Sequence, residues 1–290
     1  MSQPGPGVLV VGSLHYDIMV AAPHRPAAGE TVQGQRWHPK FGGKGGNQAV
    51  AAARAGVPVR MLGAVGDDAF GDFIRERLRR GGVDDSFVDT LPGQGSGMSV
   101  AIGDATGDYG AVIVSGANLR IDPARLGQQA LWNGVAMLVL QNEVPAALNL
   151  AAAQAARARG LRVCLNAAPY RPLPPGLAEA IDLLVVNALE AEALAGVAVA
   201  DLRGAEAAAS RLAASFPMVV VTAGGDGAAL AERGGGSFAH PAEKVTLVST
   251  HGAGDVFTGA LVAALIGGEP IRNAVGAASR AAARHVASRG

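Results

Sequence analysis

Short apolar runs alternate along this chain with alanine-rich stretches, and no other sequence feature limits its fold as strongly. The runs occupy residues 8–11, 137–140, 162–165, 183–186 and 218–221. Because they are apolar at every position except Arg162, they are typical of parallel strands that are buried on both faces. The stretches at 47–55, 68–80, 145–159 and 205–215 end near Gly or Pro, as helices do. This order predicts an α/β fold with an open, mostly parallel sheet and helices on both faces, whose ligands bind beyond the carboxyl ends of the strands.

Two segments interrupt the alternation. Residues 97–102 and 109–114 are β-prone, and the glycine- and aspartate-rich residues 103–108 between them predict an antiparallel hairpin. Together with residues 31–41, the hairpin is expected to form a small β-sheet lid, built from about 14–41 and 96–118, or a dimer surface. An ordinary edge hairpin is the alternative. No repeat or linker divides residues 1–290, so we expect a single domain.

Charge and hydropathy limit the partners. The chain has 24 Lys and Arg against 24 Asp and Glu, which argues against nucleic acid or an anionic membrane as a partner. No apolar run reaches the roughly 18 residues of a membrane span, and the first residues lack the cationic region of a signal peptide. The lone cysteine, Cys164, lies in an apolar run and excludes a disulfide framework. We expect a soluble cytoplasmic protein that acts on a small molecule.

The late motif at 250–260 reads THGAGDVFTGA, follows an expected strand at 244–248 and opens a helix. Glycines at a helix start expose backbone N–H groups, and the helix dipole adds positive potential, so this point can hold a phosphoryl group. Asp255 would place a carboxylate beside it, where it can accept the proton of an attacking hydroxyl. The alternative is that Asp255 only caps the helix.

The early motif at 41–47 reads FGGKGGN and also precedes a helix. It is not a Walker A loop, because Gly45 stands where that loop needs Ser or Thr. The glycines allow a polyol to approach the backbone, and Lys44 and Asn47 can bind hydroxyls. A flexible turn with a solvated lysine is the alternative.

Further polar residues follow the expected strands. The carboxylate of Asp17 could accept hydrogen bonds from two sugar hydroxyl groups at once. Glu143 follows the strand that ends at residue 140. Asn187 and Glu190 stand one helical turn apart and suit hydrated Mg²⁺ with its phosphates, although helix capping explains them equally well. Residues 222–227 form a glycine turn that fits either a nucleotide or a hairpin.

The order and content of these clusters resemble the PfkB-type, or ribokinase-like, carbohydrate kinase family over residues 8–290. The signatures that carry the likeness are GGKGGNQA at 42–49 and GAGD at 252–255. Within the family the likeness is greatest to the ribokinases, and it includes SGAN at 115–118 and NAAP at 166–169.

The resemblance implies a kinase that moves the γ-phosphoryl group of ATP to the primary hydroxyl of a pentose, first of all D-ribose. By resemblance, the base is Asp255 and the anion hole is the backbone of Gly252, Ala253 and Gly254. The implied sugar-binding residues are His15, Asp17, Gly43, Lys44, Asn47, Glu143 and Asp255. The implied nucleotide contacts are Asn187, Thr222, Gly225, Gly227 and Gly254, with Mg²⁺ held through water by Glu190 and Asn187. The lid would exclude water and form a homodimer.

Three departures from the family pattern qualify these expectations. His15 stands where ribokinases usually carry Asn, which keeps open another sugar, a sugar acid or a nucleoside as the substrate. Ser249 replaces an Asp that helps to hold a monovalent cation, and the chain ends at Gly290; both argue against K⁺ activation. A catalytically silent sugar or nucleotide sensor is a further alternative. An NAD-dependent oxidoreductase is disfavoured, because residues 12–15 read GSLH where a GxGxxG motif would begin.

Overall fold

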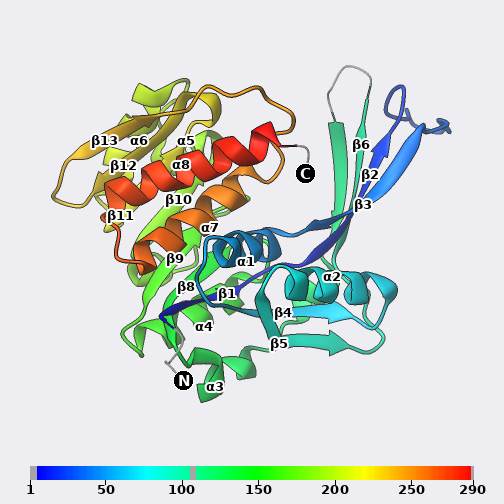
Figure 1. Cartoon of the computed structure of the whole chain (residues 1–290), viewed down its shortest axis with the longest axis horizontal. Helices are drawn as coiled ribbons and strands as arrows, with labels where there is room; N and C mark the ends of the chain where they lie inside the picture. The colour runs from blue at the N-terminus through cyan, green and yellow to red at the C-terminus, as the bar shows by residue number, and fades with distance from the viewer. Residues whose placement is uncertain (1–4, 105–108, 289–290) are drawn as a thin grey trace.

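The larger of two sheets confirms the predicted open, mostly parallel arrangement. The structure, a computed structural model, describes residues 5–104 and 109–288. The sheet has nine strands in the order β13-β12-β11-β10-β9-β8-β1-β4-β5 (Figure 1). Their bounds are β1 Gly7–Val11, β4 Val59–Gly66, β5 Val83–Leu91, β8 Val135–Gln141, β9 Arg162–Asn166, β10 Leu183–Asn187, β11 Met218–Thr222, β12 Gly227–Glu232 and β13 Ser237–Pro241. The pairings from β5 to β11 are parallel, and β12 and β13 add an antiparallel edge.

Helices cover both faces of this sheet, as its apolar strands require. They are α1 Lys44–Arg54, α2 Ala69–Arg80, α3 Gln129–Trp132, α4 Ala146–Arg157, α5 Ala188–Ala195, α6 Leu202–Leu212, α7 Ala253–Ile266 and α8 Ile271–Ala287. Leu9 and Val11 join a core with α3 to α6, whereas Val8 and Val10 join another with α1, α2, α7 and α8. Successive strand residues point to opposite faces, so one apolar run serves two cores. Cys164 is buried in the second core, where burial raises the pKa of its thiol to about 12.

The second sheet has four strands in the order β3-β2-β6-β7 and projects from the larger one (Figure 1). Its strands are β2 His15–Ala21, β3 Arg36–Gly42, β6 Met98–Gly103 and β7 Tyr109–Val114. β6 and β7 pair in antiparallel fashion, which confirms the predicted hairpin, although residues 105–108 of its turn lie outside the described part of the chain. β2 begins shortly after β1 ends, so the small sheet is joined directly to the large one at β1.

Some expectations about individual strands were wrong. Residues 244–248 are not a strand: they are exposed, and within them only the Val248 N–H joins another segment, at the carbonyl of Val286. Sequence reasoning also missed β4, whose apolar run contains Gly63, and β5, whose sequence is interrupted by Asp84, Asp85 and Asp89. Over residues 5–104 and 109–288, no helix has both the length and the apolar character to cross a bilayer.

The chain order changes direction at β1, which has β8 on one side and β4 on the other. Val11, at the end of β1, is in register with Leu140 of β8. A crevice opens at such a point, because the connections on its two sides run away from each other. The loops after β1 and β8 therefore meet at the place where this fold class binds ligands.

Gly259 allows α7 to approach α1 closely. A Cβ atom there would lie 2.5 Å from the Ala51 Cβ and 2.7 Å from the Ala52 nitrogen. We expect Gly259→Ala to lower the free energy of unfolding by about 1–3 kcal/mol, as overpacking does, in denaturant titrations. The control is Gly276→Ala in α8, where the nearest atoms are ends of flexible side chains at 3.4 Å. Equal stability of both variants would contradict the close approach.

Candidate active site

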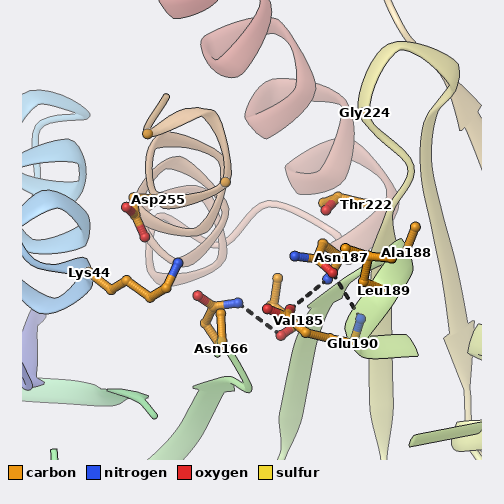
Figure 2. A pocket seen from close by; sticks show the side chains of 13 residues that line it. Lys44, Asn166, Val185, Asn187, Ala188, Leu189, Glu190, Thr222, Gly224 and Asp255 are labelled. Atoms are coloured by element: carbon orange, nitrogen blue, oxygen red, sulfur yellow. Dashed lines mark hydrogen bonds between the residues drawn. The ribbon is translucent and has the colours of Figure 1, made fainter. Parts of the chain in front are cut away.

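A cavity of about 400 Å³ opens at the carboxyl ends of β9, β10 and β11 (Figure 2). It is lined by Lys44, Asn166, Ala168, Val185, Asn187, Ala188, Leu189, Glu190, Thr222, Gly224, Gly252, Gly254 and Asp255. Figure 2 shows Lys44 extending from α1 into the space between Asp255 and Asn166. The two glycine motifs, distant in sequence, thus contribute to one cavity.

Asp255 lies in the first turn of α7 but does not cap this helix. Gly252 is the N-cap residue, with a left-handed backbone at φ 83°, and no side chain caps the helix. The Asp255 carboxylate instead accepts hydrogen bonds from Gln48 Nε2 at 2.9 Å and from Asn47 Nδ2 at 3.2 Å. The capping alternative is therefore wrong, and the carboxylate is held toward α1.

Burial sets the acidity of Asp255. The residue is 7% exposed, and removal from water raises the pKa of its carboxyl group above the ordinary aspartate value. The positive charge of Lys44 and the two amide donors act in the opposite direction but are outweighed. A carboxylate with a raised pKa is a stronger proton acceptor than an ordinary aspartate.

Gln48, which sequence reasoning did not assign a role, connects Asp255 to the sheet. Its Nε2 also donates to Asn166 Oδ1 at 2.9 Å, and its Oε1 accepts from Gln141 Nε2 at 2.9 Å. Asn166 in turn donates to the carbonyl of Val185 at 3.1 Å. The only signal in the sequence was the place of Gln48 directly after Asn47 in the early motif.

Glu143 joins the loops that follow β1 and β8. Its Oε2 accepts hydrogen bonds from Ser13 Oγ at 2.5 Å and from the Lys44 N–H at 2.8 Å. The carboxylate therefore lies at the N-terminus of α1, where the helix dipole favours it. Gly43, with φ 84°, permits this packing, because a Cβ atom there would lie 2.8 Å from the His15 nitrogen and the Ser13 oxygen.

Asp17 and His15 are buried on the same face of β2, at the base of the small sheet. Asp17 Oδ1 accepts a hydrogen bond from Ser99 Oγ at 2.5 Å. A Cβ atom at Gly42 would lie 2.0 Å from Asp17 Oδ2, so this carboxylate contacts the early glycine motif. His15 Nε2 is buried and has no hydrogen-bond partner among the described residues.

The motif at 115–118 fixes the junction between the two sheets. Asn118 is buried, and its Oδ1 accepts from the Leu14 N–H while its Nδ2 donates to the Leu14 carbonyl, both at 2.9 Å. Leu14 lies between β1 and β2. The small sheet is therefore held at its attachment point.

Asn187 and Glu190 form a capping box at the start of α5. Asn187 Oδ1 accepts from the Glu190 N–H, and Glu190 Oε2 accepts from the Asn187 N–H, both at 2.9 Å. Burial is the main cause that raises the pKa of Glu190. The capping alternative is thus confirmed for this pair, which also lines the cavity.

The turn at 222–227 joins β11 and β12 as an antiparallel hairpin, as one of the two interpretations predicted. Thr222 and Gly224 line the cavity. Gly225 lies in the turn itself, and Gly227 packs against other backbone, since a Cβ atom there would lie 2.1 Å from the His240 carbonyl. Nucleotide contacts of Gly225 and Gly227 stay predictions.

Known proteins that resemble this chain in sequence and structure are carbohydrate kinases. Residues 6–290 match the family described as pfkB family carbohydrate kinase. The chain is 33% identical to a ribokinase of Haemophilus influenzae over 97% of its length and 92% of the relative. It is 34% identical to a deoxyribokinase of Salmonella typhi over 87% of its length and 83% of the relative. The solved structure of Arabidopsis thaliana ribokinase complexed with ribose and ATP matches with a TM-score of 0.90 and 29% identity, covering 99% of this chain and 94% of that one.

The raised pKa of Asp255 predicts how stability depends on pH. The folded state holds the proton more tightly than the unfolded state, whose value is near 3.8. As the pH falls through the raised folded pKa, the native protein should gain stability relative to Asp255→Asn, until the unfolded carboxyl group also protonates. Thermal unfolding of both proteins from about pH 8 to pH 4 measures this difference. A constant difference in Tm would show that Asp255 titrates normally.

Proposed function

The chain belongs to the pfkB family of carbohydrate kinases, and we propose that it transfers the γ-phosphoryl group of ATP to D-ribose, giving D-ribose 5-phosphate. One observation carries this proposal: a buried carboxylate, Asp255, lies in the first turn of α7, beside the cavity into which Lys44 extends. Relatives named ribokinase, at about one-third identity over nearly the whole chain, support ribose as the acceptor.

The sugar would lie between the small sheet and the early glycine motif. Asp17 is placed to accept hydrogen bonds from sugar hydroxyls, and the backbone at Gly43 can approach the ring closely. Asn47 and Lys44 supply donors from α1. Glu143 already accepts two hydrogen bonds from the protein, so we assign it the positioning of the α1 N-terminus together with any contact to the sugar.

The reaction needs a base, an anion site and alignment. Asp255 accepts the proton of the sugar's primary hydroxyl group while the oxygen of that hydroxyl group bonds to the γ-phosphorus of ATP. The bond from the γ-phosphorus to the oxygen that bridges it to the β-phosphorus breaks, and ADP is released. The N–H groups of Gly252, Ala253 and Gly254 and the charge of Lys44 stabilise the charge on the transferred group. Closure of the small sheet as a lid would keep water from hydrolysing ATP.

The nucleotide would occupy the cavity beside Asn187, Thr222 and Gly224, extending toward Gly225 and Gly227. Among the residues of 5–104 and 109–288, no three His, Cys, Asp or Glu side chains converge as a metal site. Mg²⁺ would therefore be held mainly by the ATP phosphates, with Glu190 and Asn187 acting through water. When bound, the metal ion would neutralise part of the negative charge of the phosphates. We assign no role to K⁺, because Ser249 offers only a neutral hydroxyl.

The lid also suits a homodimer. Val112, Ile113 and Val114 of β7 are more than half exposed, at 69%, 57% and 52%, on the outer strand of the small sheet. Contiguous exposed apolar residues favour burial against a partner, here a second copy of the chain.

The proposal also places the protein in the cytoplasm, where ATP is available as the phosphoryl donor.

A panel of acceptors tests the substrate. ADP release would be followed with ribose, 2-deoxyribose, hexoses, sugar acids and nucleosides, with water alone as the blank. The proposal requires that ribose give the highest kcat/KM. A higher value with 2-deoxyribose would favour the activity named for the Salmonella relatives. Turnover no greater than with water for every acceptor would instead favour a catalytically silent sensor.

We expect Asp255→Asn to lower kcat by about 100-fold to 10,000-fold, because the amide cannot accept the proton. Sugar affinity, measured by calorimetry, should change little. Asp17→Ala is the matched control: it should weaken sugar binding and leave ATP binding unchanged. Retained turnover in Asp255→Asn would remove Asp255 from the role of base.

His15 is expected to bind one sugar hydroxyl through its unpartnered Nε2. We predict that His15→Leu, which keeps an apolar group of similar size, lowers kcat/KM for ribose by about 10-fold to 100-fold. The deoxy analogue that lacks the contacted hydroxyl should be affected much less. Measurements on ribose and its single-deoxy analogues decide this point, since an equal loss with every sugar would contradict a specific contact.

A further inference from the structure

The segment that leads to the proposed anion hole is not fixed by packing. Residues 243–251 form neither helix nor strand, and all of them are exposed. They nevertheless end at Gly252, whose left-handed backbone starts α7 and which lines the cavity together with Gly254. Something other than burial must hold this segment in place.

The C-terminal end of α8 holds residues 248–251 by hydrogen bonds. The Val286 carbonyl accepts hydrogen bonds from the N–H groups of Val248 and Ser249, at 2.8 Å and 3.3 Å. One residue earlier, His285 Nε2 lies 3.0 Å from the carbonyl oxygen of His251. α8 is itself anchored, because Ala274, Val275 and Ala278 are fully buried in the core that it shares with α7. It therefore offers a fixed support to a segment that lacks its own.

The contact of His285 comes closest to the anion hole. A carbonyl oxygen only accepts, so Nε2 must carry the proton, as it does in one neutral tautomer and in the imidazolium ion. The bonded carbonyl belongs to the residue directly before Gly252, and a Cβ atom on Gly252 would lie 3.4 Å from the same Nε2. Loss of this donor would free the peptide that sets the direction of the Gly252 backbone.

We propose that His285 is a positioning residue for phosphoryl transfer, whose Nε2–H holds the His251 carbonyl and so keeps the N–H groups at 252–254 aligned. This inference rests on the proposed function. Backbone donors contribute to the rate only when they point at the developing charge, and a displacement of about 1 Å costs about 100-fold. The imidazole itself touches neither sugar nor nucleotide in this role.

Two variants separate the hydrogen bond from the bulk of the side chain. His285→Phe keeps a ring and removes the donor, whereas His285→Gln places an amide nitrogen near the former Nε2. We expect His285→Phe to lower kcat by about 10-fold to 100-fold with little change in the KM for the sugar, and His285→Gln to recover most of the loss. Ser288→Ala is the control, since it removes only the hydrogen bond from Ser288 Oγ to the His285 carbonyl, and it should keep wild-type kcat.

Hydrogen–deuterium exchange gives a readout that needs no turnover. Amides at 248–254 should exchange faster in His285→Phe than in wild type, and at the wild-type rate in His285→Gln. If the wild type phosphorylates no acceptor, the proposed function fails, and the exchange experiment still decides whether His285 holds the segment. Unchanged exchange in His285→Phe, or an equal loss of kcat in both variants, would overturn the inference.

Discussion

Asp255 is a carboxylate withdrawn from water, and the surrounding polar groups compensate for its desolvation. Asn47 and Gln48 both donate to it, and Gln48 also contacts Gln141 and Asn166 at the ends of β8 and β9. The Gln48 amide is oriented by Asn166 and Gln141 as well, so it cannot turn away without leaving buried polar groups unsatisfied. The same network that tolerates the charge therefore fixes its direction. Because burial still outweighs these donors, the carboxylate keeps a raised affinity for a proton.

The position of this network follows from the topology of the large sheet. β1 and β8 are neighbours although far apart in sequence, and their following loops meet through Ser13 and Glu143. Glu143 also accepts from the first N–H of α1, so one side chain joins both loops to the helix that carries Asn47 and Gln48. The small sheet starts at this same junction, where Asn118 holds the backbone of Leu14. If the small sheet moves, it would thus turn about a junction that lies next to the candidate active site.

The sequence was sufficient for the architecture because the buried strands are apolar on both faces and the glycines mark the helix ends. It failed where tertiary contacts decide: residues 244–248 have strand-forming side chains but only one hydrogen bond from this run to a neighbouring segment. For the site, the family resemblance implied that Lys44, Asp255, Asn187 and Glu190 act together, and the structure has all four lining one cavity. It could not tell that Asp255 faces α1 whereas Asn187 and Glu190 cap α5, because capping residues and ligand-binding residues are of the same types. Gln48 escaped notice because its only signal in the sequence was its place directly after Asn47 in the early motif.

The close packing around the early glycine motif limits how this protein can evolve. Side chains at Gly42, Gly43 or Gly46 would collide with Asp17, with the backbone near His15, or with Phe41 and Leu14. We therefore expect nearly all single substitutions of these glycines to disrupt the packing and to be removed by selection. The opposite wall, on the small sheet, is formed by the buried side chains of residues such as His15 and Ser99, whose strand positions do not require glycine. A lineage that acquires a new acceptor should therefore diverge first at these strand positions, while the glycine wall stays the same.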